Sequence, residues 1–141
     1  MSRDGCVPVV VALLATLLLS PSVEGQCSTQ EVAKLVASNA AAGDYFGVSV
    51  ALDADTLVIG AYGDDYGVDT TDSGAAYVFV RVAGVWSQQA YLIDLLGNDL
   101  DYFGYSVAVE GDTAVIGAYQ ADPGTLLDAG AAYVFVRSGG V

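Results

Sequence analysis

Bulky apolar residues alternate with small or polar residues along positions 45–52 of the chain. The bulky residues occupy the even positions from Phe46 to Leu52, so a strand here would place them together on one face. Residues 56–61 are apolar at almost every position, which is typical of a strand that is covered on both faces. No segment after the N-terminal leader shows helical periodicity. We predict four antiparallel strands, at 45–52, 56–61, 75–81 and 86 to about 95.

The whole pattern occurs twice, which decides the expected fold class. A single four-stranded unit cannot bury both of its faces, so consecutive units are expected to stack. Units of this length predict an all-β fold made of antiparallel four-stranded blade repeats of a β-propeller. A small two-sheet sandwich of the repeats is the alternative. The matching segments are 44–51 with 101–108 and 55–62 with 112–119, both offset by 57, and 74–81 with 130–137, offset by 56.

The repeat also predicts how the chain is divided. Residues 29–37 align with 86–94, so the segment before the first repeat corresponds to a fourth strand. Two blade-equivalents are too few to close a propeller ring. We therefore expect a fragment whose further blades come from missing sequence or from other chains. The predicted divisions of residues 26–141 are 28–43 as the fourth strand of a preceding blade, 44–100 as a full repeat and 101–141 as a partial repeat.

Residues 1–25 have the pattern of a signal peptide. The apolar run Val9–Leu19 would form a helix of about 16 Å, roughly half the thickness of a bilayer core, so we predict secretion and no membrane span. Removal of the leader would leave Cys27 as the single thiol. Cys27 would then be unpaired, paired to another chain or paired to missing sequence.

The composition excludes several functions. A net charge of −13 repels phosphate backbones, so we expect no nucleic-acid partner. Such a surface suits cations or basic proteins, although the charge also serves simply to keep an apolar β-protein soluble. The chain has no histidine, which excludes Ser-His-Asp and Cys-His catalysis and histidine metal ligation within it. We therefore predict that the chain is not an enzyme and carries no cofactor apart from the calcium considered below.

Four short motifs give the chain a family resemblance. Phe46-Gly47 and Gly60-Ala61-Tyr62 occur in the first repeat, and Phe103-Gly104 and Gly117-Ala118-Tyr119 occur in the second. With these motifs the sequence resembles the FG-GAP repeat, the blade unit of the integrin α-chain propeller, with tyrosine where the second motif often has proline.

The resemblance implies an extracellular binding or adhesion scaffold whose propeller loops contact a protein or glycan. An accessory propeller of a larger secreted enzyme and a structural surface-layer repeat protein are the alternatives.

The calcium loop of this family is not expected in the hairpins of this chain. Residues 53–56 and 110–113 offer too few oxygen ligands and too little chain to wrap a Ca²⁺ ion. Asp55 and Asp112 are instead predicted to cap their turns.

A second acidic segment lies between the second and third predicted strands. Its carboxylates offer hard oxygen ligands for one Ca²⁺ ion. The second repeat keeps only Asp122 and Asp128 at these positions, which favours the alternative of a solvated polar loop. The candidate calcium ligands are Asp64, Asp65, Asp69 and Asp72.

Other polar and aromatic positions recur between the repeats. Asp44 and Asp101 precede Phe-Gly and are predicted to accept hydrogen bonds from nearby backbone amides. Tyr62 and Tyr119, with Tyr66 nearby, are predicted either to pack between blades or to line a rim that recognises sugars or proteins.

Overall fold

The computed structural model describes residues 29–66 and 71–139. These residues form seven strands and no helix, and so include no helix that is able to cross a membrane. All of the strands belong to the unit formed by residues 35–141. The strands are β1 (Ser49–Asp53), β2 (Thr56–Ala61), β3 (Ala75–Val82), β4 (Val85–Leu92), β5 (Phe103–Glu110), β6 (Thr113–Ala118) and β7 (Ala131–Val136).

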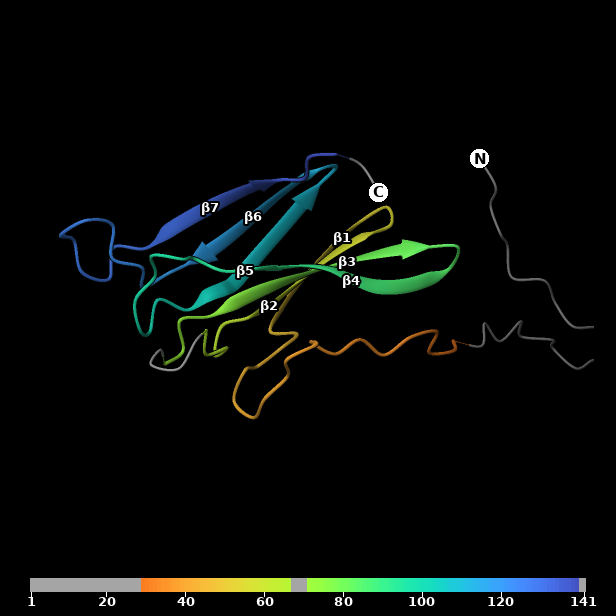
Figure 1. The fold of residues 1–141 in the computed structure, drawn as a ribbon, viewed down its shortest axis with the longest axis horizontal. Coiled ribbons are helices and arrows are strands. Elements are labelled where there is room, and N and C mark those ends of the chain that lie inside the picture. Colours follow the sequence, from red (N-terminus) through yellow and green to blue (C-terminus); the bar gives the residue numbers. More distant parts are fainter. Residues whose placement is uncertain (1–28, 67–70, 140–141) are drawn as a thin grey trace, which may run out of the picture. The chain divides into compact units, whose positions relative to one another are not determined.

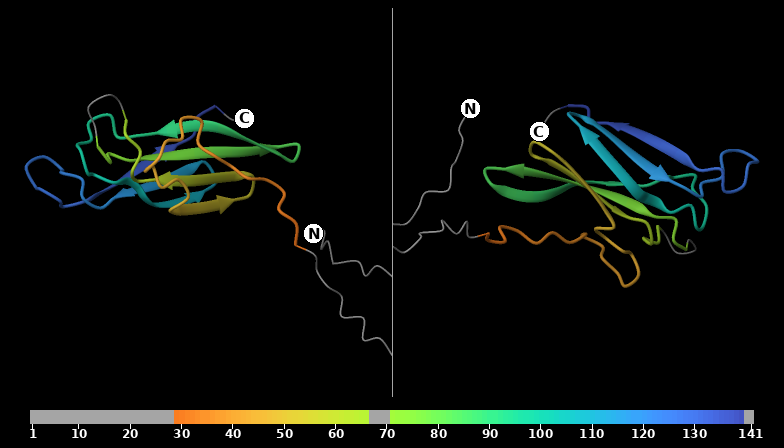
Figure 2. Two further views of the ribbon diagram at one scale, coloured as in Figure 1. Left: turned by 90° about the horizontal axis from the view of Figure 1, so that it is seen from below. Right: turned by 180° about the vertical axis from the view of Figure 1, so that it is seen from behind.

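The strands form two antiparallel sheets, one for each repeat. The first has the order β1-β2-β3-β4 and the second has the order β5-β6-β7 (Figure 1). The β3–β4 hairpin projects beyond the β1–β2 turn, which both views in Figure 2 show. The predicted all-β fold, with about two propeller blades, is confirmed.

The predicted strand at 56–61 coincides with β2, whereas the prediction for the first strand was wrong at its start. β1 begins at Ser49 rather than at Tyr45. Tyr45 has a φ of 55° and Gly47 has a φ of 94°, and this left-handed backbone interrupts an extended strand. The alternation of side chains therefore continues in sequence through a segment whose backbone is not extended.

Residues 29–43 contain no strand in the structure. A strand needs a neighbour with which to pair, so the predicted role in a preceding blade stays a prediction. The turns of this segment nevertheless repeat those between β4 and β5. The Ala40 amide donates to the Ala37 carbonyl at 3.3 Å, and the Gly97 amide donates to the Asp94 carbonyl at 3.2 Å.

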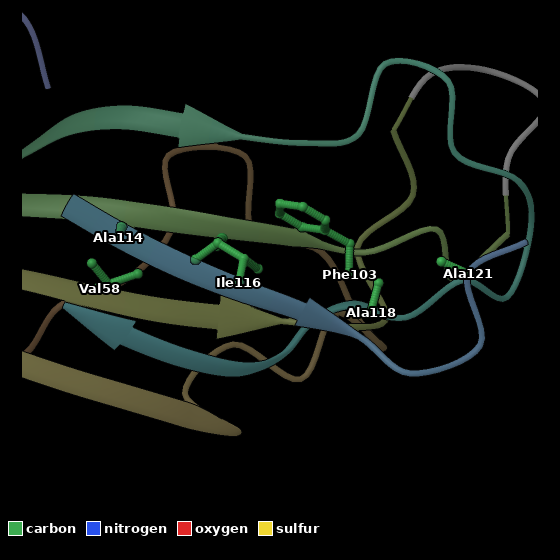
Figure 3. Packing of buried hydrophobic residues seen from close by; sticks show 7 residues of the cluster. Val58, Phe103, Ala114, Ile116, Ala118 and Ala121 are labelled. Atoms are coloured by element: carbon green, nitrogen blue, oxygen red, sulfur yellow. The ribbon is translucent and has the colours of Figure 1, made fainter. Parts of the chain in front are cut away.

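The two sheets pack face to face around one apolar cluster. Val58 of β2, Ile116 of β6 and Phe103 of β5 are fully buried in this cluster, where Val58 lies beside Ile116 (Figure 3). Complete burial of such a side chain stabilises the fold by about 1.5–3 kcal/mol. The remaining buried members of this cluster are Ala76, Ala114, Ala118 and Ala121.

Glycine lets the second repeat approach the first at the ends of the strands. A Cβ on Gly60 would overlap the carbonyl oxygen of Gly104, and a Cβ on Gly104 would overlap the carbonyl oxygen of Ala75. The Ser49 hydroxyl donates to the Gly104 carbonyl at 2.8 Å, and the Phe103 amide donates to the Ser73 carbonyl at 2.9 Å. Backbone of one repeat thus lies directly on backbone of the other.

Candidate functional site

Five tyrosines from both repeats form a continuous group at one end of the sheets. Tyr62 and Tyr119 follow β2 and β6 directly, so the turns after these strands place both rings at the same end. The other three rings come from the segment before β1 and from the start of the second sheet. We call this group the tyrosine row, and its members are Tyr45, Tyr62, Tyr102, Tyr105 and Tyr119.

Each repeat contributes one stacked pair to the tyrosine row. The rings of Tyr45 and Tyr62 lie 4.9 Å apart with planes 5° from parallel. The equivalent rings of Tyr102 and Tyr119 lie 5.3 Å apart with planes 8° from parallel. Tyr105 joins the pairs, because its ring lies 5.6 Å from that of Tyr62 and 4.7 Å from that of Tyr119. The two predicted roles of Tyr62, packing between repeats and lining a rim, are therefore both geometrically available.

The backbone of the row is held in an uncommon conformation in both repeats. Tyr45 and Tyr102 each have a φ of 55°, in the left-handed region that bulky residues rarely adopt. Such a conformation destabilises the fold by about 1–3 kcal/mol, and a stacked aromatic pair stabilises it by about 0.5–1.5 kcal/mol. The two repeats thus hold equivalent tyrosines in the same backbone conformation.

The row combines exposed apolar faces with neutral hydroxyl groups. The exposed fractions of Tyr45, Tyr105 and Tyr119 are 61%, 50% and 53%. Desolvation by neighbouring groups, followed by repulsion from Tyr45 and Asp72, raises the pKa of Tyr62 above its ordinary value. Desolvation likewise raises the pKa of Tyr119. Both hydroxyls therefore stay protonated at neutral pH and are able to donate hydrogen bonds to a ligand.

Tyr66, which the sequence placed with Tyr62, lies elsewhere. Its ring is 6.5 Å from that of Tyr91 on β4, and it is not a member of the tyrosine row. The prediction from sequence also missed Tyr45, Tyr102 and Tyr105. The pairing of the hairpin could have indicated Tyr45. Ser49 pairs with Gly60, so the segment before β1 approaches Tyr62.

Asp64, a candidate calcium ligand, points into the protein. The hydroxyls of Tyr77 and Tyr91 each donate to its carboxylate at 2.5 Å, and the Asn39 amide donates at 3.2 Å. Asp64 is 1% exposed, and the Tyr77 hydroxyl also lies 2.8 Å from the side-chain oxygen of Asn39. Burial, and then the hydrogen bond to Asp64, raise the pKa of both tyrosines above the ordinary value.

Asp65 and Asp72, two further candidate ligands, are linked to each other in the loop. An Asp65 carboxylate oxygen accepts a hydrogen bond from the Asp72 amide at 2.8 Å, which holds the loop closed on itself. Asp69 lies outside the described residues. Among residues 29–66 and 71–139, no group of three or more acidic or thiol side chains is arranged to hold a metal ion. Calcium binding by this loop stays a prediction, and calorimetric titration with CaCl₂ tests it.

The prediction for Asp44 and Asp101 is confirmed. Asp44 accepts a hydrogen bond from the Ala41 amide at 2.6 Å, and Asp101 accepts one from the Asn98 amide at 2.7 Å. Both carboxylates are buried and fix the turn that leads into Phe-Gly. They therefore position the backbone that carries Tyr45 and Tyr102.

Asp55 and Asp112 form ion pairs with arginine, and their predicted capping of the turns stays a prediction. An Asp55 carboxylate oxygen lies 2.7 Å from the Arg81 guanidinium, and an Asp112 oxygen lies 2.7 Å from that of Arg137. The arginines stand at the ends of β3 and β7, so each ion pair ties a hairpin turn to the neighbouring strand. Sequence proximity alone does not reveal this pairing.

A cavity of about 350 Å³ lies between the sheets at the end remote from the tyrosine row. Thr56, Val58, Ala114 and Phe135 contribute to its lining. Arg137 also reaches the cavity, but its guanidinium already contacts Asp112, Thr56 and Gln89. The tyrosine row is therefore the stronger candidate for a binding site.

The fold and the contacts between its sheets define a class of repeat protein whose antiparallel blades stack through glycine-containing strand ends. The model of the FG-GAP repeat family matches residues 29–79 and 86–135, and the chain belongs to this family. No curated protein matches the chain. In this structure the Phe-Gly motif of the second repeat, Phe103-Gly104, contacts Gly60 of the first, so the two halves of the family signature meet across the repeats.

The predicted signal peptide and Cys27 lie outside the described residues.

Proposed function

We propose that the chain is an extracellular binding scaffold that holds a protein or glycan partner on the tyrosine row. The observation that supports this proposal most strongly is that five tyrosine rings are in continuous contact across two repeats. Three of these rings are at least half exposed. Tyrosine is suited to this role because it offers a large rigid apolar face and one polar group, and it is enriched among residues that dominate binding energy.

Charge narrows the class of partner. Asp72 and Asp128 lie close enough to raise the pKa of Tyr62 and Tyr119, respectively, and the whole chain carries a net charge of −13. An anionic ligand would be repelled from this surface. A neutral glycan or a basic protein surface is therefore the proposed partner.

A non-catalytic role agrees with the composition. The chain contains no histidine, and the described residues hold their buried carboxylates in structural hydrogen bonds. The signal-peptide pattern of residues 1–25 supports a location outside the cell. Family membership supports the same location, since this repeat is typical of extracellular proteins.

The test compares two triple variants on arrays of glycans and of purified extracellular proteins. The first variant replaces the three exposed rings by serine, as Tyr45→Ser, Tyr105→Ser and Tyr119→Ser. The matched control removes exposed apolar side chains elsewhere, as Val85→Ser, Leu96→Ser and Leu127→Ser, whose exposed fractions are 68%, 90% and 79%.

The proposal expects a ligand whose affinity falls at least about tenfold in the tyrosine variant, since binding hot spots contribute about 2 kcal/mol or more. The control variant should bind that ligand as the unmodified chain does. Equal binding by all three proteins would place the ligand elsewhere and overturn the role of the tyrosine row.

A further inference from the structure

The stacked pairs of the tyrosine row bring phenol rings close enough to react with each other. The rings of Tyr45 and Tyr62 lie 4.9 Å apart with planes 5° from parallel. Those of Tyr102 and Tyr119 lie 5.3 Å apart with planes 8° from parallel. Offset-stacked rings touch at such separations. Two phenols join by a carbon–carbon bond between the ring carbons beside their hydroxyls, and each pair holds its two rings face to face for that reaction.

The stacking belongs to each repeat and does not depend on what lies beside it. Two rings of the second repeat, those of Tyr102 and Tyr105, lie 5.6 Å from the ring of Tyr62. Among the described residues, the ring of Tyr119 contacts only rings of its own repeat. Both pairs are nevertheless almost parallel. A chemical role of the pairs is therefore a property of the repeat itself.

Contact between the two pairs gives an unpaired electron a path along the row. Tyr105 is 50% exposed, and its ring lies 5.6 Å from that of Tyr62 and 4.7 Å from that of Tyr119. Electrons move readily between aromatic rings in contact, so oxidation of one exposed ring is able to reach both pairs.

Few other side chains compete for an oxidant. Residues 29–139 contain no cysteine and no methionine, the side chains that oxidise most readily. The single tryptophan, Trp86, has the guanidinium carbon of Arg81 5.2 Å from its ring centroid. The positive charge of that guanidinium opposes removal of an electron from the indole. The tyrosines are therefore the main oxidisable groups of this part of the chain.

A carboxylate lies near each pair and is able to accept the proton that an oxidised phenol releases. A Cβ on Gly63 would lie 3.3 Å from Asp72 Oδ1 and 3.0 Å from Tyr45 Cδ2, so both groups border this glycine. Asp128 is the equivalent of Asp72, and their φ values are 51° and 50°. Desolvation, followed by repulsion from neighbouring tyrosines and from Asp128, raises the pKa of Tyr119. The two repeats thus place equivalent acidic groups near equivalent pairs.

We propose that the tyrosine row is a site of oxidative cross-linking, at which a haem peroxidase with hydrogen peroxide joins the two stacked rings of each repeat as dityrosine. Each ring loses one electron and one proton to become a tyrosyl radical. The two radicals couple through the ring carbons beside their hydroxyls, and the hydrogens on these carbons then move to the phenolic oxygens. The peroxide takes up the two electrons and two protons and leaves as two water molecules.

The new bond is a covalent staple within each repeat. It joins the segment before β1 to the turn after β2 in the first repeat, and the residue before β5 to the turn after β6 in the second. A link that closes a loop lowers the entropy of the unfolded chain, as a disulfide does. Residues 29–139 contain no cysteine and so form no disulfide of their own. This role does not rest on the proposed binding function, since it needs no partner on the row.

Treatment of the purified chain with a haem peroxidase and hydrogen peroxide tests the proposal. The monomer should lose two hydrogen atoms for each link, as measured by intact mass. Cleavage beside aspartate, at Asp53 and Asp112, separates the two tyrosines of each pair, so the digest should contain Tyr45 linked to Tyr62 and the equivalent link in the second repeat. The Tm of the linked monomer should rise by at least about 4 °C.

Phenylalanine variants identify the reacting phenols. Tyr62→Phe combined with Tyr119→Phe keeps both stacks of rings but removes one phenol from each pair. Dityrosine fluorescence of the monomer should fall at least about tenfold, because rings held in place react far faster than rings that meet by diffusion. Tyr66→Phe is the matched control, since the ring of Tyr66 lies outside the row, and its yield should equal that of the unmodified chain.

The peptide map of the unmodified chain gives a result that does not depend on the folding of any variant. A monomer that keeps its full mass, or links found only at other tyrosines or between separate chains, would overturn the proposal. Equal yields from the phenylalanine variant and the unmodified chain would overturn it as well. A linked monomer with an unchanged Tm would overturn the role of the bond as a staple.

Discussion

Asp64 shows how burial changes the role of a carboxylate. The sequence groups it with Asp65 and Asp72 because the three are close along the chain. The fold instead turns Asp64 inward to accept hydrogen bonds from Tyr77 on β3 and Tyr91 on β4. A buried polar group that loses its partners costs about 1–3 kcal/mol, so this carboxylate is chiefly a structural acceptor.

Asp64→Asn should lower the free energy of unfolding by about 1–3 kcal/mol, because the amide nitrogen replaces one acceptor oxygen beside two hydroxyl donors. Denaturant unfolding measures this change. Asp65→Asn is the matched control, since Asp65 is exposed and its effect should stay below about 1 kcal/mol. Equal losses in the two variants would show that the buried hydroxyls do not depend on Asp64.

The bounds of some strands were predicted from the sequence more accurately than those of others. β2 was predicted at its observed bounds because a continuous apolar run is delimited by turn residues on both sides. The start of β1 was not predicted correctly, because the left-handed φ at Tyr45 does not change the alternation of bulky and small residues in the sequence. The contact of Tyr62 with Tyr105 depends on how two sheets pack, and the spacing of residues within one repeat does not contain that information.

Three tyrosines on the strands, hydrogen-bonded to carboxylates, predict alkaline unfolding. Burial and hydrogen bonds to Asp64 or Asp94 raise the pKa of Tyr77, Tyr91 and Tyr133 in the folded state. A folded-state pKa above the unfolded value contributes stability below about pH 10, and this contribution is lost as the pH rises further.

Absorbance titration should therefore show Tyr77, Tyr91 and Tyr133 ionising above the ordinary tyrosine pKa of about 10, together with loss of the β-sheet circular dichroism signal. Tyr133→Phe removes one of the late groups and serves as the control, because only the late phase should shrink. A single phase near about pH 10 with the circular dichroism signal intact would contradict the raised pKa of these three hydroxyls.

The whole described unit depends on close contact between repeats that lie far apart in sequence. Gly104 and Gly47 occupy equivalent positions with nearly equal φ values of 87° and 94°. Their surroundings differ, because Gly104 lies against Ala75 and Gly47 lies against open space. Alanine substitutions at the two glycines can therefore be compared. The loss of stability at Gly47 reports the backbone conformation alone, and the additional loss at Gly104 reports the contact between the sheets.

Calorimetric unfolding of the unmodified chain, Gly47→Ala and Gly104→Ala tests this account of the fold most directly. The unmodified chain should unfold in one cooperative transition. Gly47→Ala should lose about 1–2 kcal/mol from its left-handed φ alone. Gly104→Ala should lose a further 1–3 kcal/mol or so, because its methyl group forces the sheets apart. Equal losses in the two variants, or separate transitions for the two repeats in the unmodified chain, would contradict the account.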